Sequence, residues 1–71
     1  MIKISSSKIR DITRDIDGKV IDAIQFTKSG EPEGIAAVFS VNTSDEELAK
    51  AAIKKYLKEK FPVLRTYVEI V

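Results

Sequence analysis

The segment from Asp45 to Lys60 most constrains the fold, because it carries several independent signals of an amphipathic helix. Acidic residues stand at its start and lysines at its end, which suits the two poles of a helix dipole. Apolar residues recur at helical spacing on one side: Leu48, Ala49, Ala52, Ile53, Tyr56 and Leu57. Thr43 and Ser44 each precede a glutamate by three residues, so either could cap the first turn. Because Pro62 then disfavours helix, we predict a helix over residues 45–60.

Three other segments are rich in β-branched and aromatic residues, which predicts strands. They are residues 20–27, 35–41 and 63–71. Residues 28–34, with two glycines and a proline, join the first two segments and predict a hairpin. Alternation in this hairpin directs six residues to the core: Ile24, Phe26, Ile35, Ala37, Phe39 and Val41.

Residues 7–17 fit two structures. Their isoleucines recur at helical spacing: Ile9, Ile12 and Ile16. Gly18 suits the left-handed position that follows a helix end. The pair Asp17-Gly18 is also a strong hairpin-turn signal, which would make the flanking residues strands. We favour the helix, because in a strand Arg14 would share a face with apolar neighbours.

With that helix and a short first strand at residues 2–4, the element order is βαββαβ. We predict a single α+β domain over residues 1–71 in the ferredoxin-like arrangement, a small antiparallel sheet with two helices on one face. The alternative is a three- or four-stranded meander packed on the single helix at residues 45–60. A chain of 71 residues buries only about 60% of its unfolded surface, so a second copy could add stability.

The composition argues against several functions. The chain has no Cys and no His, which removes thiolate chemistry, the commonest general base near neutral pH and the commonest transition-metal ligand. We therefore expect no enzyme activity, no cofactor and no metal. No apolar run approaches the roughly 20 residues that cross a bilayer, and the first residues do not resemble a signal peptide. We expect a cytoplasmic protein without a membrane partner.

One stretch matches part of an RNA-binding signature. From Gly34 onward, small and apolar residues fall in step with a strand whose exposed aromatic side chains stack on bases. Here Ile35, Ala37 and Ser40 stand where those aromatic residues belong. We interpret the stretch as an ordinary buried strand.

A row of lysines is the first functional signal. Lys50, Lys54 and Lys58 stand at steps of four in the predicted helix, which places them on its outer face. Residues 50–65 contain six basic residues and one acidic residue, and a row of like charge gains nothing for the helix. These lysines are candidate phosphate contacts of a nucleic-acid-binding module. Because the net charge is only +1, this is the alternative function.

The predicted sheet face opposite the helices is the second signal. It is half apolar, whereas a face that meets water usually alternates to polar residues. Its candidate interface residues are Ile21, Ala23, Val38, Arg65 and Tyr67. Apolar patches with Tyr and Arg often mark interfaces. We therefore expect a non-catalytic protein-interaction or regulatory module that self-associates as a homodimer through this face, or binds another protein there.

Overall fold

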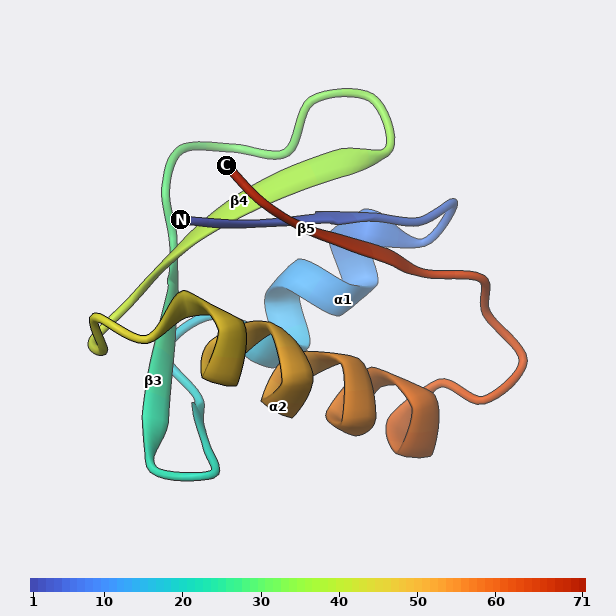
Figure 1. Ribbon diagram of the computed structural model, residues 1–71. Coiled ribbons are helices and arrows are strands. Elements are labelled where there is room, and N and C mark those ends of the chain that lie inside the picture. Colours follow the sequence, from blue (N-terminus) through green and yellow to red (C-terminus); the bar gives the residue numbers. More distant parts are fainter.

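The structure is a computed structural model that describes residues 1–71 as an α+β domain with two helices on one face of a five-stranded antiparallel sheet (Figure 1). The strands are β1 (Ile2–Ser5), β2 (Val20–Ile21), β3 (Ile24–Lys28), β4 (Ala36–Val41) and β5 (Tyr67–Ile70). The helices are α1 (Ile9–Ile16) and α2 (Glu46–Lys60). The strand order is β2-β3-β4-β1-β5, so β2 and β5 form the two edges of the sheet.

The predicted α+β class is confirmed, but the sheet has a fifth strand that the predicted βαββαβ order lacks. Residues 20–27 do not form one strand, because the chain turns back between β2 and β3. Asp22 and Ala23 occupy this turn with φ angles of 51° and 66°. Two consecutive residues of positive φ are typical of a tight type I′ hairpin turn, which glycine usually signals. The dipeptide Asp-Ala gives no such signal, so the sequence did not reveal the turn.

The helix expected within residues 7–17 is present as α1. Its three isoleucines are buried, as the helical spacing predicts. The helix ends at Ile16 with Asp17 as its C-cap, and Gly18 follows with a φ of 81°, a conformation that glycine adopts without strain. Asp17-Gly18 therefore terminates a helix and does not form a strand hairpin.

The predicted helix at residues 45–60 is confirmed as α2, but its cap differs from the prediction. Asp45 is the N-cap, because its Oδ1 accepts a hydrogen bond of 3.1 Å from the backbone N–H of Leu48. The assignment of the cap to Thr43 or Ser44 is wrong. Thr43 Oγ1 instead accepts from the N–H of Asp45 at 3.2 Å, so it supports the turn that presents the cap.

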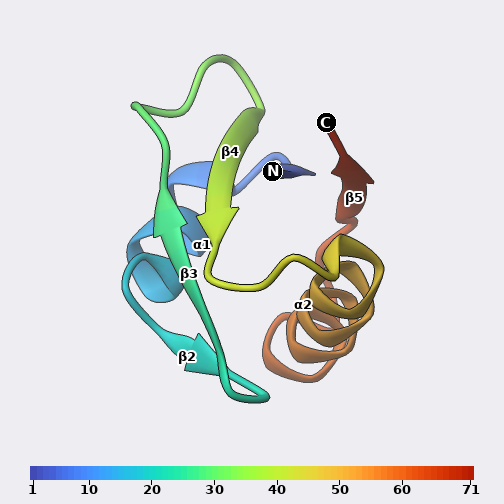
Figure 2. The ribbon, with the colours of Figure 1, turned by 60° about the vertical axis from the view of Figure 1, so that its left-hand side comes forward.

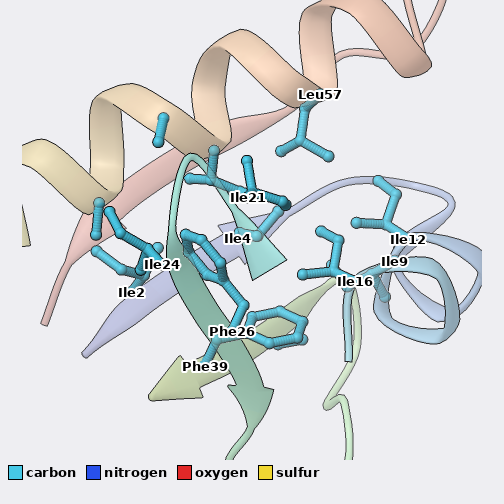
Figure 3. Packing of buried hydrophobic residues seen from close by; sticks show 14 residues of the cluster. Ile2, Ile4, Ile9, Ile12, Ile16, Ile21, Ile24, Phe26, Phe39 and Leu57 are labelled. Carbon is cyan, nitrogen blue, oxygen red and sulfur yellow. The ribbon is translucent and has the colours of Figure 1, made fainter. Parts of the chain in front are cut away.

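The core fills the space between the sheet and the two helices (Figure 3). Its largest fully buried side chains are Phe26, Phe39, Ile2, Ile4, Ile12, Ile16, Ile53 and Leu57. Two residues expected in the core are exposed. Ile35 is 60% exposed because it precedes β4, and Leu48 is 55% exposed because the buried side of α2 centres on Ala49 and Ile53.

The two ends of the chain lie side by side, because β1 pairs antiparallel with both β4 and β5 (Figure 1). The N–H of Val71 donates to the carbonyl of Met1 at 2.9 Å, and the amino group of Met1 donates to the carbonyl of Val71 at 3.1 Å. The last strand of the chain is thus an edge of the sheet. Neither helix combines the length and the apolar character that crossing a membrane requires.

Candidate functional site

The five residues that the sequence assigned to one open sheet face lie in different parts of the structure. Val38 lies on this face between the buried residues of β4, and Tyr67, which is 60% exposed, lies there on β5. Ala23 occupies the β2–β3 turn, and Arg65 lies in the loop that precedes β5. Ile21 is buried in the core, because it pairs with Ile24 across a tight turn and so shares its face. The expectation that Ile21 faces the open side is wrong.

The open face is more polar than the sequence predicts. Lys3 lies beside Val38, and Ser5 lies between Ala36 and Tyr67. The apolar side chains at the centre of this face are therefore few, small or half-buried. The face resembles one that meets water more than one that must be covered.

The predicted lysine row lies on α2, where Lys54 and Lys58 are exposed and Lys50 is half-buried. None of these three lysines takes part in any of the five ion pairs of the structure. Lys60, by contrast, approaches Asp15 at 3.9 Å. The row is thus a set of positive charges without intramolecular partners.

Tertiary structure adds Arg65 to this row. A surface depression of about 570 Å³ lies between α2 and the loop that leads to β5. Its polar lining is Lys54, Lys55, Lys58, Arg65 and Thr66, without any carboxylate. We call this depression, with its four cationic side chains Lys54, Lys55, Lys58 and Arg65, the basic groove. The sequence counted Arg65 among the basic residues of 50–65 but placed its side chain on the open sheet face, away from the lysines.

A second depression connects the basic groove to the edge of the sheet. It is lined by Ser5, Lys54, Thr66, Tyr67, Val68 and Glu69. Because Lys54 and Thr66 line both depressions, the two adjoin. Figure 2 shows β5 on the opposite side of the sheet from β2 and β3, with α2 beneath it. One continuous surface therefore joins the lysines of α2 to the free edge of β5.

The backbone of β5 has unpaired groups on this edge. Met1 and Val71 exchange two hydrogen bonds, and in an antiparallel ladder such pairs alternate with pairs that exchange none. Val68 and Ile70 stand opposite residues of β1 at the positions without such exchange. Their N–H and C=O groups consequently point away from β1, where the sheet has no further strand.

A polar cluster joins the two helices at another place. Tyr56 Oη donates to Asp15 Oδ2 at 2.5 Å, and Lys19 Nζ donates to Tyr56 Oη at 2.8 Å. Burial acts to raise the pKa of Asp15, but hydrogen bonds from Tyr56 and Lys19 and the nearby ammonium groups outweigh it and leave that pKa below its ordinary value. The hydrogen bond to Tyr56 raises the pKa of Lys19. Because all three groups satisfy one another, the cluster acts as a structural link between α1 and α2.

Thr13 is a polar residue that sequence analysis missed. Its side chain is buried on α1, and its Oγ1 has no hydrogen-bond partner. It borders a depression of about 300 Å³ in which Arg10, Arg14 and Lys28 face the carboxylates of Asp17 and Glu31. Lys28 Nζ donates to Glu31 Oε1 at 3.0 Å, so part of this charge is already neutralised. The mixed charge makes this depression a weaker binding candidate than the basic groove.

No group of three or more acidic, His or Cys side chains gathers as a metal site would require. Comparison with protein-family models, with curated proteins and with solved structures finds no match to the chain.

Proposed function

We propose that the protein is a non-catalytic protein-interaction module that binds a polypeptide strand along the free edge of β5. The observation that carries this proposal is the outward direction of the backbone groups of Val68 and Ile70 at an edge with no further strand. An extended segment can add to such an edge through main-chain hydrogen bonds, with pockets for alternate side chains supplying selectivity.

The two edges of the sheet are not equivalent in this respect. β2 has only two residues, so it offers little backbone to a partner. β5 has four residues and adjoins the depression that Lys54 and Thr66 line. Natural proteins usually protect long edges with charges, bulges or covering segments. β5 itself carries one charged residue, the exposed Glu69, and the lysines beside it belong to α2.

We further infer that the domain is a variant of the ferredoxin-like arrangement. The partial order β3-β4-β1-β5, with both helices on one face, supports this inference. In this interpretation β2 is an added strand at the far edge. β5, at the other edge, keeps the place of the last strand of that arrangement.

Self-association through the open sheet face is a second form of the proposed interaction. Its support is the group formed by Ala36, Val38 and Tyr67, which lie on that face. The burial of Ile21 and the turn position of Ala23 reduce the apolar area that the sequence predicted for it. The oligomeric state in solution tests this form directly.

Nucleic-acid binding is the second candidate function, and the basic groove favours it. Four cations with no carboxylate among them could contact phosphates, and each such contact makes affinity fall with salt. Substitution of Lys50, Lys54 and Lys58 by Gln should then abolish binding of a single-stranded oligonucleotide. If the unaltered protein binds the oligonucleotide with no salt dependence, or not at all, this candidate is wrong.

Selection of binders from a library of random 12-residue peptides tests the proposed function. Hydrogen exchange of the backbone amides then locates each selected peptide. We expect slower exchange at Val68 and Ile70 in the complex, because their N–H groups gain acceptors. If no peptide is enriched, or if selected peptides protect other amides only, the protein does not bind strands at β5.

A further inference from the structure

Pairing at the free edge determines which way the side chains of an added strand face. Residues directly opposite one another in a sheet point to the same face. The side chains of Val68 and Ile70 face the helices, where they pack against the core. Partner residues opposite Thr66, Val68 and Ile70 would therefore face α2, and the residues between them would lie on the side of Tyr67.

The lysine row of α2 lies where these partner side chains would arrive. α2 runs antiparallel to β5 beneath it (Figure 1). Lys54 borders the depression along Thr66 and Val68, and Lys58 borders the one along Thr66. Alternate residues of a strand are about 6.7 Å apart, and residues four apart on a helix rise by about 6 Å. Successive side chains on one face of an added strand thus have nearly the same spacing as Lys54 and Lys58 along α2.

We infer that the strand bound at β5 is acidic, with Asp or Glu at the two alternate positions opposite Thr66 and Val68. This inference rests on the proposed function. The cations of the basic groove form no ion pair within the chain, so a carboxylate of the partner displaces no existing partner. Glu47 lies beside Lys50 at the other end of the row, so the preference for acid does not extend to the position opposite Ile70.

The same charges disfavour a second copy of β5 as the occupant of this edge. Two-fold pairing of the edges would place two lysine rows side by side in one continuous sheet. Like charges brought together across an interface oppose association and exclude that partner. An acidic strand meets the opposite situation at the positions opposite Thr66 and Val68, because its carboxylates there face Lys54 and Lys58. Glu69 also lines the depression of Lys54, but it lies on the side of β5 that carries Tyr67.

Three hexapeptides with blocked ends test the inference: Thr-Glu-Val-Glu-Val-Thr, its analogue with both Glu replaced by Gln, and its analogue with both replaced by Lys. At low salt the Glu peptide should bind about tenfold more tightly than the Gln peptide, because each exposed charge pair contributes modestly. The Lys peptide should not bind. Raising salt from about 20 mM to about 500 mM should remove most of the difference between Glu and Gln peptides, because exposed charges are screened.

Two pairs of variants separate charge from backbone pairing. Lys54→Gln with Lys58→Gln should reduce the Glu peptide to the affinity of the Gln peptide, whereas Lys8→Gln, at an exposed lysine outside the groove, should not. Val68→Pro removes an outward N–H without breaking the ladder to β1, and proline is tolerated at such edge positions. It should abolish binding of both peptides, whereas Val68→Ala, which keeps the N–H, should retain it.

The outcomes distinguish the inference from the proposed function. Equal affinity for the Glu and Gln peptides, with both protecting the amides of Val68 and Ile70, overturns the acidic preference and leaves strand binding intact. If neither peptide protects these amides in the unaltered protein, while selected library peptides do, the acidic preference fails as well. Absence of protection by every peptide overturns both. A single-stranded oligonucleotide that binds the groove when the Glu peptide does not also overturns the inference.

Discussion

Tyr56 on α2 donates a hydrogen bond of 2.5 Å to the carboxylate of Asp15 on α1, and this contact joins two helices far apart in the sequence. Tyr56→Phe should lower the free energy of unfolding by about 1 kcal/mol at pH 7. A fully buried hydrogen bond to a charged group contributes about 1.5–3 kcal/mol to stability. We expect a smaller contribution here, because this hydrogen bond is partly exposed. Chemical denaturation measures the change.

The same variant should change the pH dependence of stability. The pKa of Asp15 is lowered in the folded protein, so its contribution is present above the unfolded value of about 3.9 and is lost as pH falls through the lower folded value. The difference in stability between the parent and Tyr56→Phe should therefore shrink below about pH 4. An equal difference at pH 7 and pH 3 would show that Asp15 does not mediate the effect.

Asp45, as the N-cap of α2, should be important for stability. Asp45→Ala should cost about 1 kcal/mol, because the N–H of Leu48 loses its acceptor. Ser44→Ala is the matched control, since Ser44 is exposed and forms no hydrogen bond through its side chain, and it should change stability by less than about 0.5 kcal/mol. If the denaturation midpoint falls more for Ser44→Ala than for Asp45→Ala, the cap assignment is wrong.

The β2–β3 turn contains strain that glycine would relieve. Ala23 has a φ of 66°, which costs an L-residue about 1 kcal/mol. Ala23→Gly should therefore stabilise the protein by about 0.5 kcal/mol, after the greater freedom of glycine in the unfolded chain is subtracted. The same chemical change at Ala51, exposed on α2, should destabilise by about 1 kcal/mol. If Ala23→Gly and Ala51→Gly shift the melting temperature in the same direction, Ala23 does not have the left-handed conformation.

The unpartnered hydroxyl of Thr13 should reduce stability. Thr13→Val keeps the shape of the side chain and removes a buried polar atom that has no partner. We expect the free energy of unfolding to rise by about 1 kcal/mol. Thr13→Ser keeps the hydroxyl and loses a buried methyl group, so it should be destabilising. Destabilisation by the Val variant would mean that the hydroxyl has a partner.

Self-association through the open sheet face predicts a concentration-dependent mass. Val38→Lys would place two lysines close together near the two-fold axis of such a dimer, so the variant should sediment as a monomer where the parent does not. It should remain folded, because Val38 points away from the helices. If the parent is monomeric at about 100 μM, well above a micromolar dissociation constant, this form of interaction does not occur.

The sequence alone determined the elements whose signals lie within a few residues. α2 follows from its charge asymmetry and apolar spacing, and α1 follows from three isoleucines and the glycine after them. The position of the lysine row followed as well, because helical geometry places residues four apart on one face. Burial of Phe26 and Phe39 needed only the alternation of a strand.

Tertiary structure decided the features that depend on how distant segments meet. Ala23 adopts a left-handed conformation that its own chemistry disfavours, and this turn moves Ile21 from the predicted open face into the core. Arg65 joins the lysines of α2 only because β5 pairs with β1 and carries the preceding loop back over the helix. Such placements depend on the sum of many packing contacts, each weak, between residues distant in sequence. For this reason the local pattern predicted most of the secondary structure, whereas the candidate binding surface became visible only in the folded chain.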